Sequence, residues 1–364
     1  MPPIPMAIDS PRPLLSVRDL RVHFFMDEGV VKAVDGISFD VLPGQVFGVV
    51  GESGCGKSVA MRAILRIVEP PGRIVSGEIL LRRPTGASGV TGDGVVSDLA
   101  ALDPGGRAMR SIRGGEISLI PQEPMAAFSP VHSVGNQILE AIALHRDVGE
   151  RDARRLAVQL CGDVGIPAPE QHLDQYAWQL SGGLRQRALI AMALSCNPRL
   201  LIADEPTTAV DVTTQAQVLR LLRKLQASRG TAIIFITHDL GVIAQMADHV
   251  MVMYLGRVME QGPVDRIFHA PQHPYTQALL RSIPSIRSAP RTSLPTITGS
   301  IPHPFNRPRG CPFHPRCPHV IPGRCDRDTP ALREIAGGHQ VSCFLYEPPS
   351  GSGPGEDAKG EGPP

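Results

Sequence analysis

The chain lacks an excess of either charge, and it lacks any long apolar run. Its 36 lysines and arginines nearly balance its 35 aspartates and glutamates, which gives a formal net charge of +1. This balance argues against a polybasic nucleic-acid-binding protein. No apolar stretch reaches the roughly 18 residues that a membrane-spanning helix needs. Residues 1–13 carry no apolar segment flanked by positive charge, so we expect no secretory signal and a cytoplasmic protein.

The 364 residues do contain enough apolar material for a large core. Hydrophobic residues make up 42% of the chain, which excludes wholesale disorder. The length suits one large domain with an appendage, or two domains. Prolines are frequent at both ends, so we expect residues 1–13 to form a flexible leader and residues 348–364 a disordered tail.

Three short and almost continuously apolar runs predict strands that are buried on both faces of a parallel sheet. These runs are residues 45–50, 199–203 and 231–236. Helical spacing of apolar residues lies between them, as in residues 214–228, and this alternation predicts an α/β fold. Residues 83–106 break the pattern with many Gly, Thr and Ser, and we expect a flexible surface loop there.

One glycine-rich segment fits the phosphate-loop pattern G-x-x-x-x-G-K-[ST] in its required context, after a strand and before a helical stretch. Backbone N–H groups of such a loop point at phosphate oxygens, and the following helix adds its positive end. The lysine supplies a charge for the β- and γ-phosphates, and the serine hydroxyl coordinates Mg²⁺. The residues expected to bind the nucleotide are Gly51, Glu52, Ser53, Gly54, Cys55, Gly56, Lys57, Ser58 and Val59.

Two carboxylates follow the apolar run at 199–203. Asp204 stands where ligands bind in α/β sheets, at the carboxyl end of a strand, and we expect it to hold the Mg²⁺ shell. Glu205 is the expected general base for the attacking water. Together with the phosphate loop, this pair predicts hydrolysis of a nucleoside triphosphate.

A second anion-binding feature lies about 18 residues before these carboxylates. Leu180-Ser-Gly-Gly-Leu-Arg-Gln-Arg187 opens a helical stretch, and a Ser-Gly-Gly at a helix N-terminus offers a hydroxyl, free N–H groups and the helix dipole. One interpretation is contact with a partner's nucleotide. The other is an ordinary serine N-cap with glycines for close packing.

The phosphate loop, Leu-Ser-Gly-Gly-x-x-Gln and Asp-Glu, in this order, resemble the ATP-binding cassette of ABC transporters. The resemblance covers residues 14–265 and implies a P-loop NTPase fold with a RecA-like core, an antiparallel β subdomain and an α-helical subdomain at about 123–190. In this family two cassettes pair head to tail. Each ATP then lies between one subunit's phosphate loop and the other's signature motif, here Ser181, Gly182, Gly183 and Gln186.

The resemblance also assigns roles to single residues. Gln122 matches the glutamine that touches the metal, so Mg²⁺ is expected at Ser58, Gln122 and Asp204. Asp211 matches the D-loop, in which Thr208 and Val210 depart mildly from the usual pattern. His238 matches the switch histidine and joins Glu205 as a catalytic residue. Phe24 lies where the family places an aromatic ring that stacks on adenine, although a strand phenylalanine is more often a core residue.

Four of the seven cysteines crowd the C-terminal part of the chain, at Cys311, Cys317, Cys325 and Cys343. Their spacing lacks the short C-x-x-C pairs of many structural zinc sites. Two Cys-Pro pairs are similar to runs that bind iron–sulfur clusters. An iron–sulfur cluster, a zinc site that includes His314 or His319, and free thiols or disulfides remain the alternatives.

This part of the chain resembles the C-terminal extension of oligopeptide and dipeptide transporter ATPases. The matching residues are His273-Pro-Tyr-Thr-Gln-Ala-Leu-Leu280 and Cys311-Pro-Phe-His-Pro-Arg-Cys317-Pro. The resemblance predicts a small, irregular, cysteine-rich extension at residues 266–347 and a [4Fe–4S] cluster on the four cysteines, with Zn²⁺ as the alternative.

The expected function is that of the ATP-binding and ATP-hydrolysing subunit of a bacterial peptide importer at the cytoplasmic face of the cell membrane. The resemblance implies as partners two membrane permeases, a second and paralogous ATPase subunit, and an extracytoplasmic substrate-binding protein, with no nucleic acid. Nickel, opines or glutathione remain alternative substrates. A soluble ABC-type ATPase and a catalytically dead module are the rival classes, and the second would lack Glu205 or His238, which this chain keeps.

Overall fold

The computed structural model describes residues 12–84, 94–208, 211–283 and 297–347. The predicted leader, apart from residues 12 and 13, and the predicted tail therefore lie outside the described residues. The strands are β1 (Leu15–Met26), β2 (Gly29–Val41), β3 (Val46–Val50), β4 (Gly72–Arg83), β5 (Val95–Asp98), β6 (Ile117–Ile120), β7 (Leu200–Asp204), β8 (Ala232–Ile236), β9 (His249–Tyr254), β10 (Arg257–Pro263), β11 (Arg333–Ala336) and β12 (His339–Val341).

The helices connect these strands and cover their faces. The α-helices are α1 (Lys57–Ile64), α2 (Arg107–Ile112), α3 (Pro124–Ala127), α4 (Val134–His145), α5 (Glu150–Asp163), α6 (Pro169–Leu173), α7 (Gly182–Leu194), α8 (Val212–Arg229), α9 (Leu240–Met246), α10 (Val264–His269) and α11 (Pro274–Arg281). Short 3₁₀ turns are η1 (Leu99–Ala101), η2 (Ala177–Gln179), η3 (Pro304–Asn306), η4 (His314–Arg316) and η5 (Phe344–Tyr346).

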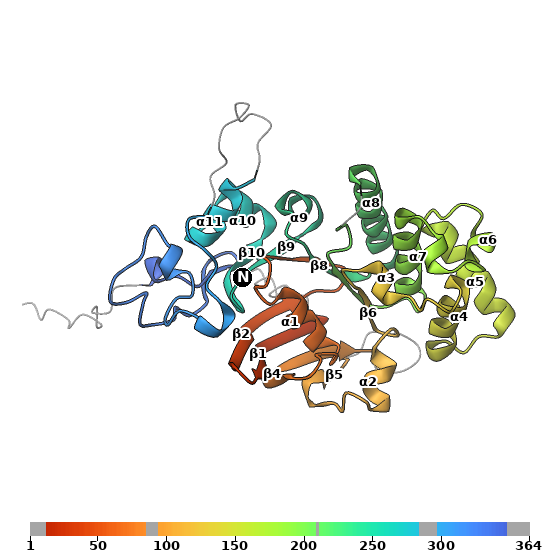
Figure 1. Cartoon of the computed structure of the whole chain (residues 1–364), viewed down its shortest axis with the longest axis horizontal. Helices are drawn as coiled ribbons and strands as arrows, with labels where there is room; N and C mark the ends of the chain where they lie inside the picture. The colour runs from red at the N-terminus through yellow and green to blue at the C-terminus, as the bar shows by residue number, and fades with distance from the viewer. Residues whose placement is uncertain (1–11, 85–93, 209–210, 284–296, 348–364) are drawn as a thin grey trace, which may run out of the picture.

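A sheet with the strand order β11-β12-β10-β9-β3-β8-β7-β6 forms the centre of the molecule (Figure 1). The pairings of β9, β3, β8, β7 and β6 are parallel. Every residue of β3, β7 and β8 is buried, as their apolar sequences predict for strands covered on both faces. The predicted α/β fold is confirmed, and the phosphate loop and the Asp-Glu pair both follow strands of this parallel part.

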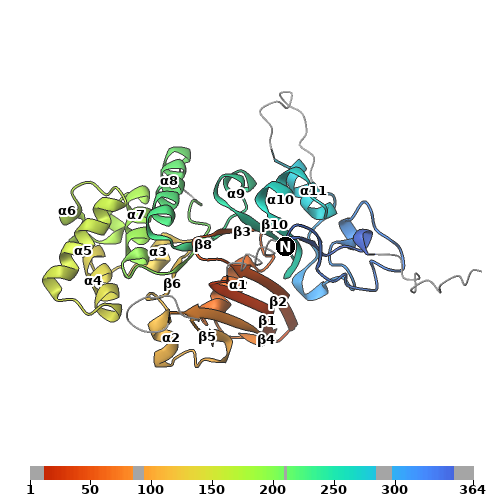
Figure 2. The ribbon, with the colours of Figure 1, turned by 180° about the vertical axis from the view of Figure 1, so that it is seen from behind.

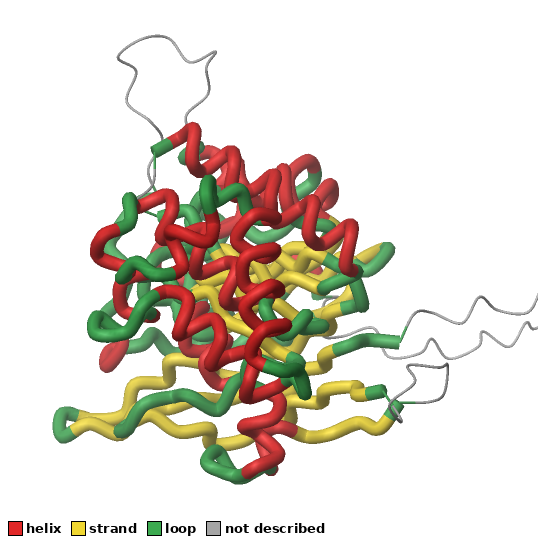
Figure 3. Tube along the Cα trace, turned by 90° about the vertical axis from the view of Figure 1, so that its right-hand side faces the viewer, coloured by secondary structure: helices red, strands yellow, loops and turns green. Residues whose placement is uncertain are grey.

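A second, antiparallel sheet with the order β2-β1-β4-β5 forms a separate layer (Figure 3). Its apolar face shares one core with α1 and the central sheet, which includes Leu20, Ile37, Ile64 and Ile79. The prediction of a flexible loop at 83–106 is partly wrong. Residues 95–98 form β5 on the edge of this sheet, and residues 99–101 form η1. Residues 85–93 of that predicted loop lie outside the described residues.

Helices α3 to α7 form an arm at one end of the molecule (Figure 1). Helix α7 is buried along most of its length because its sequence is apolar on nearly every face after Arg187. It packs with α4 and α5 in the core that also contains α8 and α9. Helix α7 lies in this arm, apart from α1, in both front and back views (Figures 1 and 2).

The C-terminal extension lies at the opposite end and is less irregular than expected. Its strands β11 and β12 continue the central sheet, with Glu260 of β10 paired with Val341 of β12. Phe313 is fully buried against Tyr254 and Tyr275, with ring centroids 5.5 Å and 5.3 Å apart. The extension therefore shares the core of the ATPase domain.

Candidate functional site

The phosphate loop (residues 51–58) has a backbone that glycine makes possible. Gly51, Gly54 and Gly56 have φ angles of 149°, 77° and 101°. A Cβ atom at position 51 would lie 2.2 Å from the carbonyl oxygen of Met253, and one at position 56 would lie 2.1 Å from that of Ala33. The loop is thus held tightly against two neighbouring segments, and both positions require glycine.

Lys57 begins α1 and is buried, with 6% of its surface exposed. Its ammonium group donates hydrogen bonds of 2.8 Å to the carbonyl of Gly51 and 3.1 Å to that of Glu52. The charge therefore lies across the loop, where it can meet the phosphates of a nucleotide. Cys55 is also buried, and burial raises the pKa of its thiol.

Ser58 and Asp204 lie side by side although they are far apart in the sequence. The Ser58 hydroxyl donates a 3.0 Å hydrogen bond to Asp204 Oδ1. Burial, together with the charge of Glu205, raises the pKa of the Asp204 carboxyl. A hydroxyl and a carboxylate are oxygen ligands of the kind that Mg²⁺ takes beside a triphosphate, so this pair fits the predicted metal position.

Three residues from separate motifs, Gln122, Thr208 and His238, meet at Glu205. Its Oε2 accepts a hydrogen bond of 2.9 Å from Thr208 and one of 3.2 Å from Gln122. His238 Nδ1 lies 3.4 Å from the same oxygen. Glu205 itself has a φ of 49°, a left-handed conformation that is uncommon outside glycine. Its backbone N–H is held by the carbonyl of Ile236 at 3.0 Å, so β8 fixes this turn.

The signature motif divides into an exposed part and a buried part. Ser181 is the N-cap of α7 and accepts the N–H of Leu184 at 3.4 Å, and it is exposed together with Gly182. Gln186 is only 2% exposed and donates a 2.7 Å hydrogen bond to the carbonyl of Pro206. The end of the motif thus connects α7 to the turn after Glu205 within the same chain, while its beginning faces outward.

Asp211 lies beside this exposed end. It caps α8 and accepts hydrogen bonds from the backbone N–H and the hydroxyl of Thr214, and these bonds lower the pKa of its carboxyl. A Cβ atom on Gly183 would lie 3.4 Å from the Thr214 methyl group. The signature motif and the D-loop residue therefore share one face. Val210 lies outside the described residues.

Phe24 is half-buried and packs against the core of the antiparallel layer. A Cβ atom on Gly72 would lie 2.6 Å from its ring, so one side of the ring is closely covered. Its neighbour Phe25 is 38% exposed and lies under the guanidinium of Arg73, 4.1 Å from the ring centroid. The assignment of Phe24 to adenine stays a prediction.

The four C-terminal cysteines line one small cavity, together with His314 and His319. Burial raises the pKa of the Cys311 thiol to about 12 and that of Cys343 to about 11. Within the described ranges, no three Cys, His, Asp or Glu side chains are arranged to hold a metal ion. The structure therefore gives the predicted cluster no support beyond the shared cavity.

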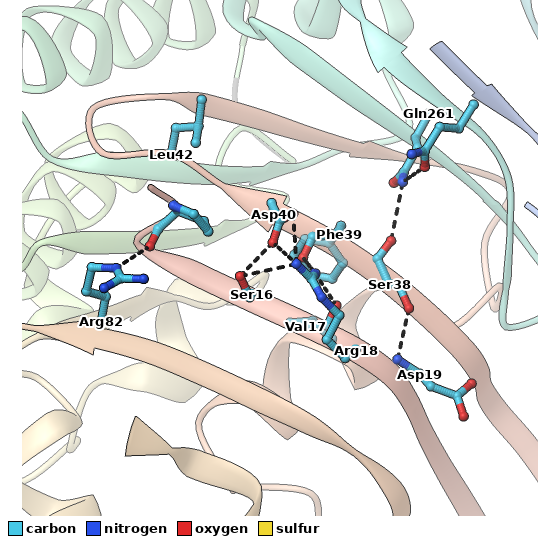
Figure 4. Close-up of polar contacts among 12 residues, drawn as sticks. Ser16, Val17, Arg18, Asp19, Ser38, Phe39, Asp40, Leu42, Arg82 and Gln261 are labelled. Carbon is cyan, nitrogen blue, oxygen red and sulfur yellow. Dashed lines mark hydrogen bonds and ion pairs between the residues drawn. The ribbon is translucent and has the colours of Figure 1, made fainter. Parts of the chain in front are cut away.

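A larger cavity of about 850 Å³ lies away from the phosphate loop, between β1, β2, β10 and the extension. Its arginines are paired with aspartates, as in the bonds of 2.7 Å from Arg18 to Asp40 and 2.8 Å from Arg257 to Asp35. Figure 4 shows Arg18 on Asp40 and the contact of Gln261 with Ser38. The arginines that line this cavity are therefore paired with carboxylates of the chain itself.

The fold and the phosphate loop define the class of a P-loop ATPase with the motifs of an ATP-binding cassette. The family model described as "ABC transporter" matches residues 34–208, and "Oligopeptide/dipeptide transporter, C-terminal region" matches residues 259–325. The chain belongs to the ATP-binding proteins of this ABC transporter family. Among the described residues, no helix is both long enough and apolar enough to cross a membrane.

Individual relatives agree with this assignment along nearly the whole chain. A probable peptide ABC transporter ATP-binding protein of Sinorhizobium fredii is 45% identical over 91% of this chain and 94% of its own length. The dipeptide transport ATP-binding protein of Escherichia coli is 43% identical over 91% and 96%. A solved dimeric ATP-binding cassette bound to ADP and phosphate matches the fold with a TM-score of 0.58 at 21% identity, covering 69% of this chain and 98% of that one.

Sequence reasoning missed two residues that contact the phosphate loop. Arg316 bonds to the carboxylate of Glu52, and the Tyr275 hydroxyl accepts the N–H of Glu52 at 3.0 Å. Both residues stood within the motifs of the extension, but no local pattern connects them to a loop more than 200 residues earlier. The one signal in the sequence is the carboxylate of Glu52 inside a loop expected to bind phosphate. A negative charge at such a position is favourable only when a cation lies nearby.

Proposed function

We propose that this chain is the ATP-hydrolysing subunit of a bacterial importer of dipeptides or oligopeptides. The observation that carries the proposal is the gathering of Gln122, Thr208 and His238 on Glu205, next to the Ser58–Asp204 pair. Relatives named as peptide and dipeptide transport ATP-binding proteins, which match along nearly the full length, support the substrate class.

Each group of site residues has its own role in ATP hydrolysis. Lys57 and the loop N–H groups hold the β- and γ-phosphates, and Ser58, Asp204 and Gln122 hold Mg²⁺, which offsets phosphate charge when bound. Glu205 accepts a proton from the attacking water as its general base. His238, which lies 3.4 Å from Glu205, contacts the γ-phosphate.

The exposed Ser181 and Gly182, with the half-buried Gly183, complete the ATP site of a second, paralogous cassette, with Asp211 beside them at the interface. The partners further include two membrane permeases and an extracytoplasmic binding protein, so the chain lies at the cytoplasmic face of the membrane. ATP favours the closed pair because it makes contacts with the companion that exist only in that state. Residues 14–265 form the ATPase domain and residues 266–347 the extension.

The cysteine site is proposed to hold a [4Fe–4S] cluster, with Zn²⁺ as the alternative. The support is the donor set, since four thiols share one cavity and two precede proline. When bound, such a group would crosslink a segment with little regular structure. Cys311, Cys317, Cys325 and Cys343 are the proposed ligands.

The test is substrate-stimulated ATP hydrolysis by the complex that co-purifies with this chain, reconstituted in nanodiscs with its binding protein. We expect co-purified permeases and stimulation by dipeptides or oligopeptides, lost in Lys57→Ala. Stimulation only by nickel, an opine or glutathione would change the substrate. A chain that purifies without permeases, and whose ATPase responds to nucleic acid or ribosomes, would favour a soluble ABC-type ATPase and contradict the proposal.

A further inference from the structure

Arg316 connects the C-terminal extension directly to the phosphate loop. Its guanidinium donates hydrogen bonds of 2.8 Å and 3.1 Å to the two carboxylate oxygens of Glu52, the second residue of the loop. The side chain of Arg316 is only 4% exposed and that of Glu52 is 20% exposed. A bidentate, largely buried pair of this kind fixes geometry as well as charge.

Two further hydrogen bonds hold Arg316 in place, one to the extension and one to β9. The Nε group donates a 3.1 Å hydrogen bond to the carbonyl of Thr298, and Nη1 donates one of 3.2 Å to the hydroxyl of Tyr254. Few rotamers remain open to a guanidinium that is bonded on several sides. The position of Glu52 therefore depends in part on the extension, through Arg316.

The backbone of Glu52 is held from the same side. Its N–H donates to Tyr275, which is fully buried in a ring cluster with Tyr254 and Phe313. Phe313 lies between Cys311 and Cys317. Both the side chain and the main chain of Glu52 are thus anchored to the core in which the cysteine segment (residues 311–343) takes part.

The short turn η4, between Cys311 and Cys317, carries Arg316. Arg316 ends η4, whose ends are fixed by bonds of 3.0 Å from His314 N–H to the Cys311 carbonyl and 3.2 Å from Cys317 N–H to the His314 carbonyl. The N–H of Cys311 also bonds the carbonyl of Cys325 at 2.9 Å. A change in the fold of the cysteine segment therefore moves Arg316.

We propose that Arg316 is a positioning residue for the phosphate loop, and that through it the cysteine segment sets the affinity for ATP. The loop is held closely at Gly51 and Gly56, but its middle needs support, because Ser53 and Gly54 are exposed and Gly54 adopts a left-handed backbone conformation. Holding the loop in its binding shape removes an ordering cost from ATP binding. The inference rests on the proposed ATP site and adds the extension to it.

The test is a double-mutant cycle on the dissociation constant of Mg²⁺-ATP, with Arg316→Gln, Glu52→Gln and both together. We expect each single variant to weaken binding about tenfold, and the double variant to bind no more weakly than either, as contacting pairs behave. Arg316→Lys should recover part of the loss, since an ammonium keeps a charge but not the fork. The KM for ATP should rise more than kcat falls.

Arg307→Gln is the matched control. Arg307 also joins the extension to the ATPase domain, through a 3.0 Å bond to Asp35, but it does not touch the phosphate loop. It should lower thermal stability and leave ATP affinity unchanged. Three results would each overturn the proposal. They are a wild-type ATP affinity in Arg316→Gln, a loss of ATP affinity in Arg307→Gln as large as that in Arg316→Gln, and additive effects of the Arg316 and Glu52 substitutions. Lys57→Ala in the same assay distinguishes failure of this proposal from failure of the proposed ATP site. Unchanged ATP binding in Lys57→Ala would show that the phosphate loop is not the ATP site.

Coupling between two sites is reciprocal, which gives a second measurement. Mg²⁺-ATP should slow amide hydrogen exchange in residues 311–325 of the wild-type chain and have little effect there in Arg316→Gln. Equal protection in both proteins, or none in the wild type, would contradict coupling through this arginine.

Discussion

Gln122 and Glu205 are joined by a hydrogen bond of 3.2 Å, from the glutamine amide to the carboxylate. Gln122 precedes α3, whereas Glu205 follows β7 and is the proposed general base. A movement of the segment around Gln122 would therefore change the position of the proposed general base.

Glu205→Gln should keep ATP binding and lose turnover. The amide retains the shape that Thr208 and Gln122 contact, but it cannot accept a proton, so hydrolysis should fall by about 10²–10⁴-fold. Phosphate release at saturating ATP measures the effect, and Glu140→Gln, on the exposed side of α4, is the control expected to have no effect. Substantial turnover in Glu205→Gln would require another base.

Lys57→Ala should abolish ATP binding. The buried ammonium spans the phosphate loop, and its loss removes the main charge for the β- and γ-phosphates. Equilibrium binding of a fluorescent ATP analogue reports this loss, with Lys224→Ala on the exposed face of α8 as the lysine control. If the two lysine variants bound the analogue equally well, the nucleotide would lie elsewhere.

Stability should fall as the pH drops below about 6.5 because of His273. This histidine is 1% exposed, and burial lowers its pKa to about 3. The unfolded chain, with a histidine pKa of about 6.5, binds the proton first, so acid favours unfolding by about 1.4 kcal/mol per pH unit between these two values. Above pH 6.5 His273 is neutral in both the folded and the unfolded chain, so it causes no loss of stability there.

Urea unfolding of the wild type and His273→Asn measures this dependence, since asparagine keeps an N-cap for α11 without titrating. The difference in unfolding free energy between the two proteins should shift in favour of the variant between pH 7 and pH 5. A difference that stays constant over this range would show that His273 does not resist protonation.

Cys311→Ser should remove metal from the extension. Iron, acid-labile sulfide and zinc in anaerobically purified protein decide between the proposed cluster and zinc, and Cys196→Ser, outside the cysteine segment, should keep the wild-type content. Equimolar zinc without sulfide would show that the site binds Zn²⁺ and not an iron–sulfur cluster. Protein with neither metal would show that the cysteines hold no metal.

The sequence predicted the parallel strands well and marked the phosphate loop, because each rests on a local pattern. The strands β3, β7 and β8 are apolar throughout, and the phosphate loop has a fixed spacing of glycines and lysine. The short strand β5 was missed because it adjoins a segment rich in glycine and serine. The strands β11 and β12 were missed because strands of three or four residues leave little periodicity to detect.

The contacts between distant segments could not be predicted in the same way. Arg316 and Glu52 lie 264 positions apart, and Ser58 and Asp204 lie 146 apart. The second pair was expected only because both belong to a known chemistry, the coordination of Mg²⁺. The first pair depends on how the extension packs on the central sheet, which no residue pattern encodes locally.

The most direct test of the account is a structure of the Glu205→Gln complex, purified with its own partners and loaded with Mg²⁺-ATP. The measured quantity is the distance from the γ-phosphate held by Lys57 to the nearest atom of another cassette. We predict a companion's serine–glycine helix end at hydrogen-bond distance, about 3 Å, with Ser181 of this chain equally close to the companion's nucleotide. A γ-phosphate surrounded by this chain alone would contradict the account.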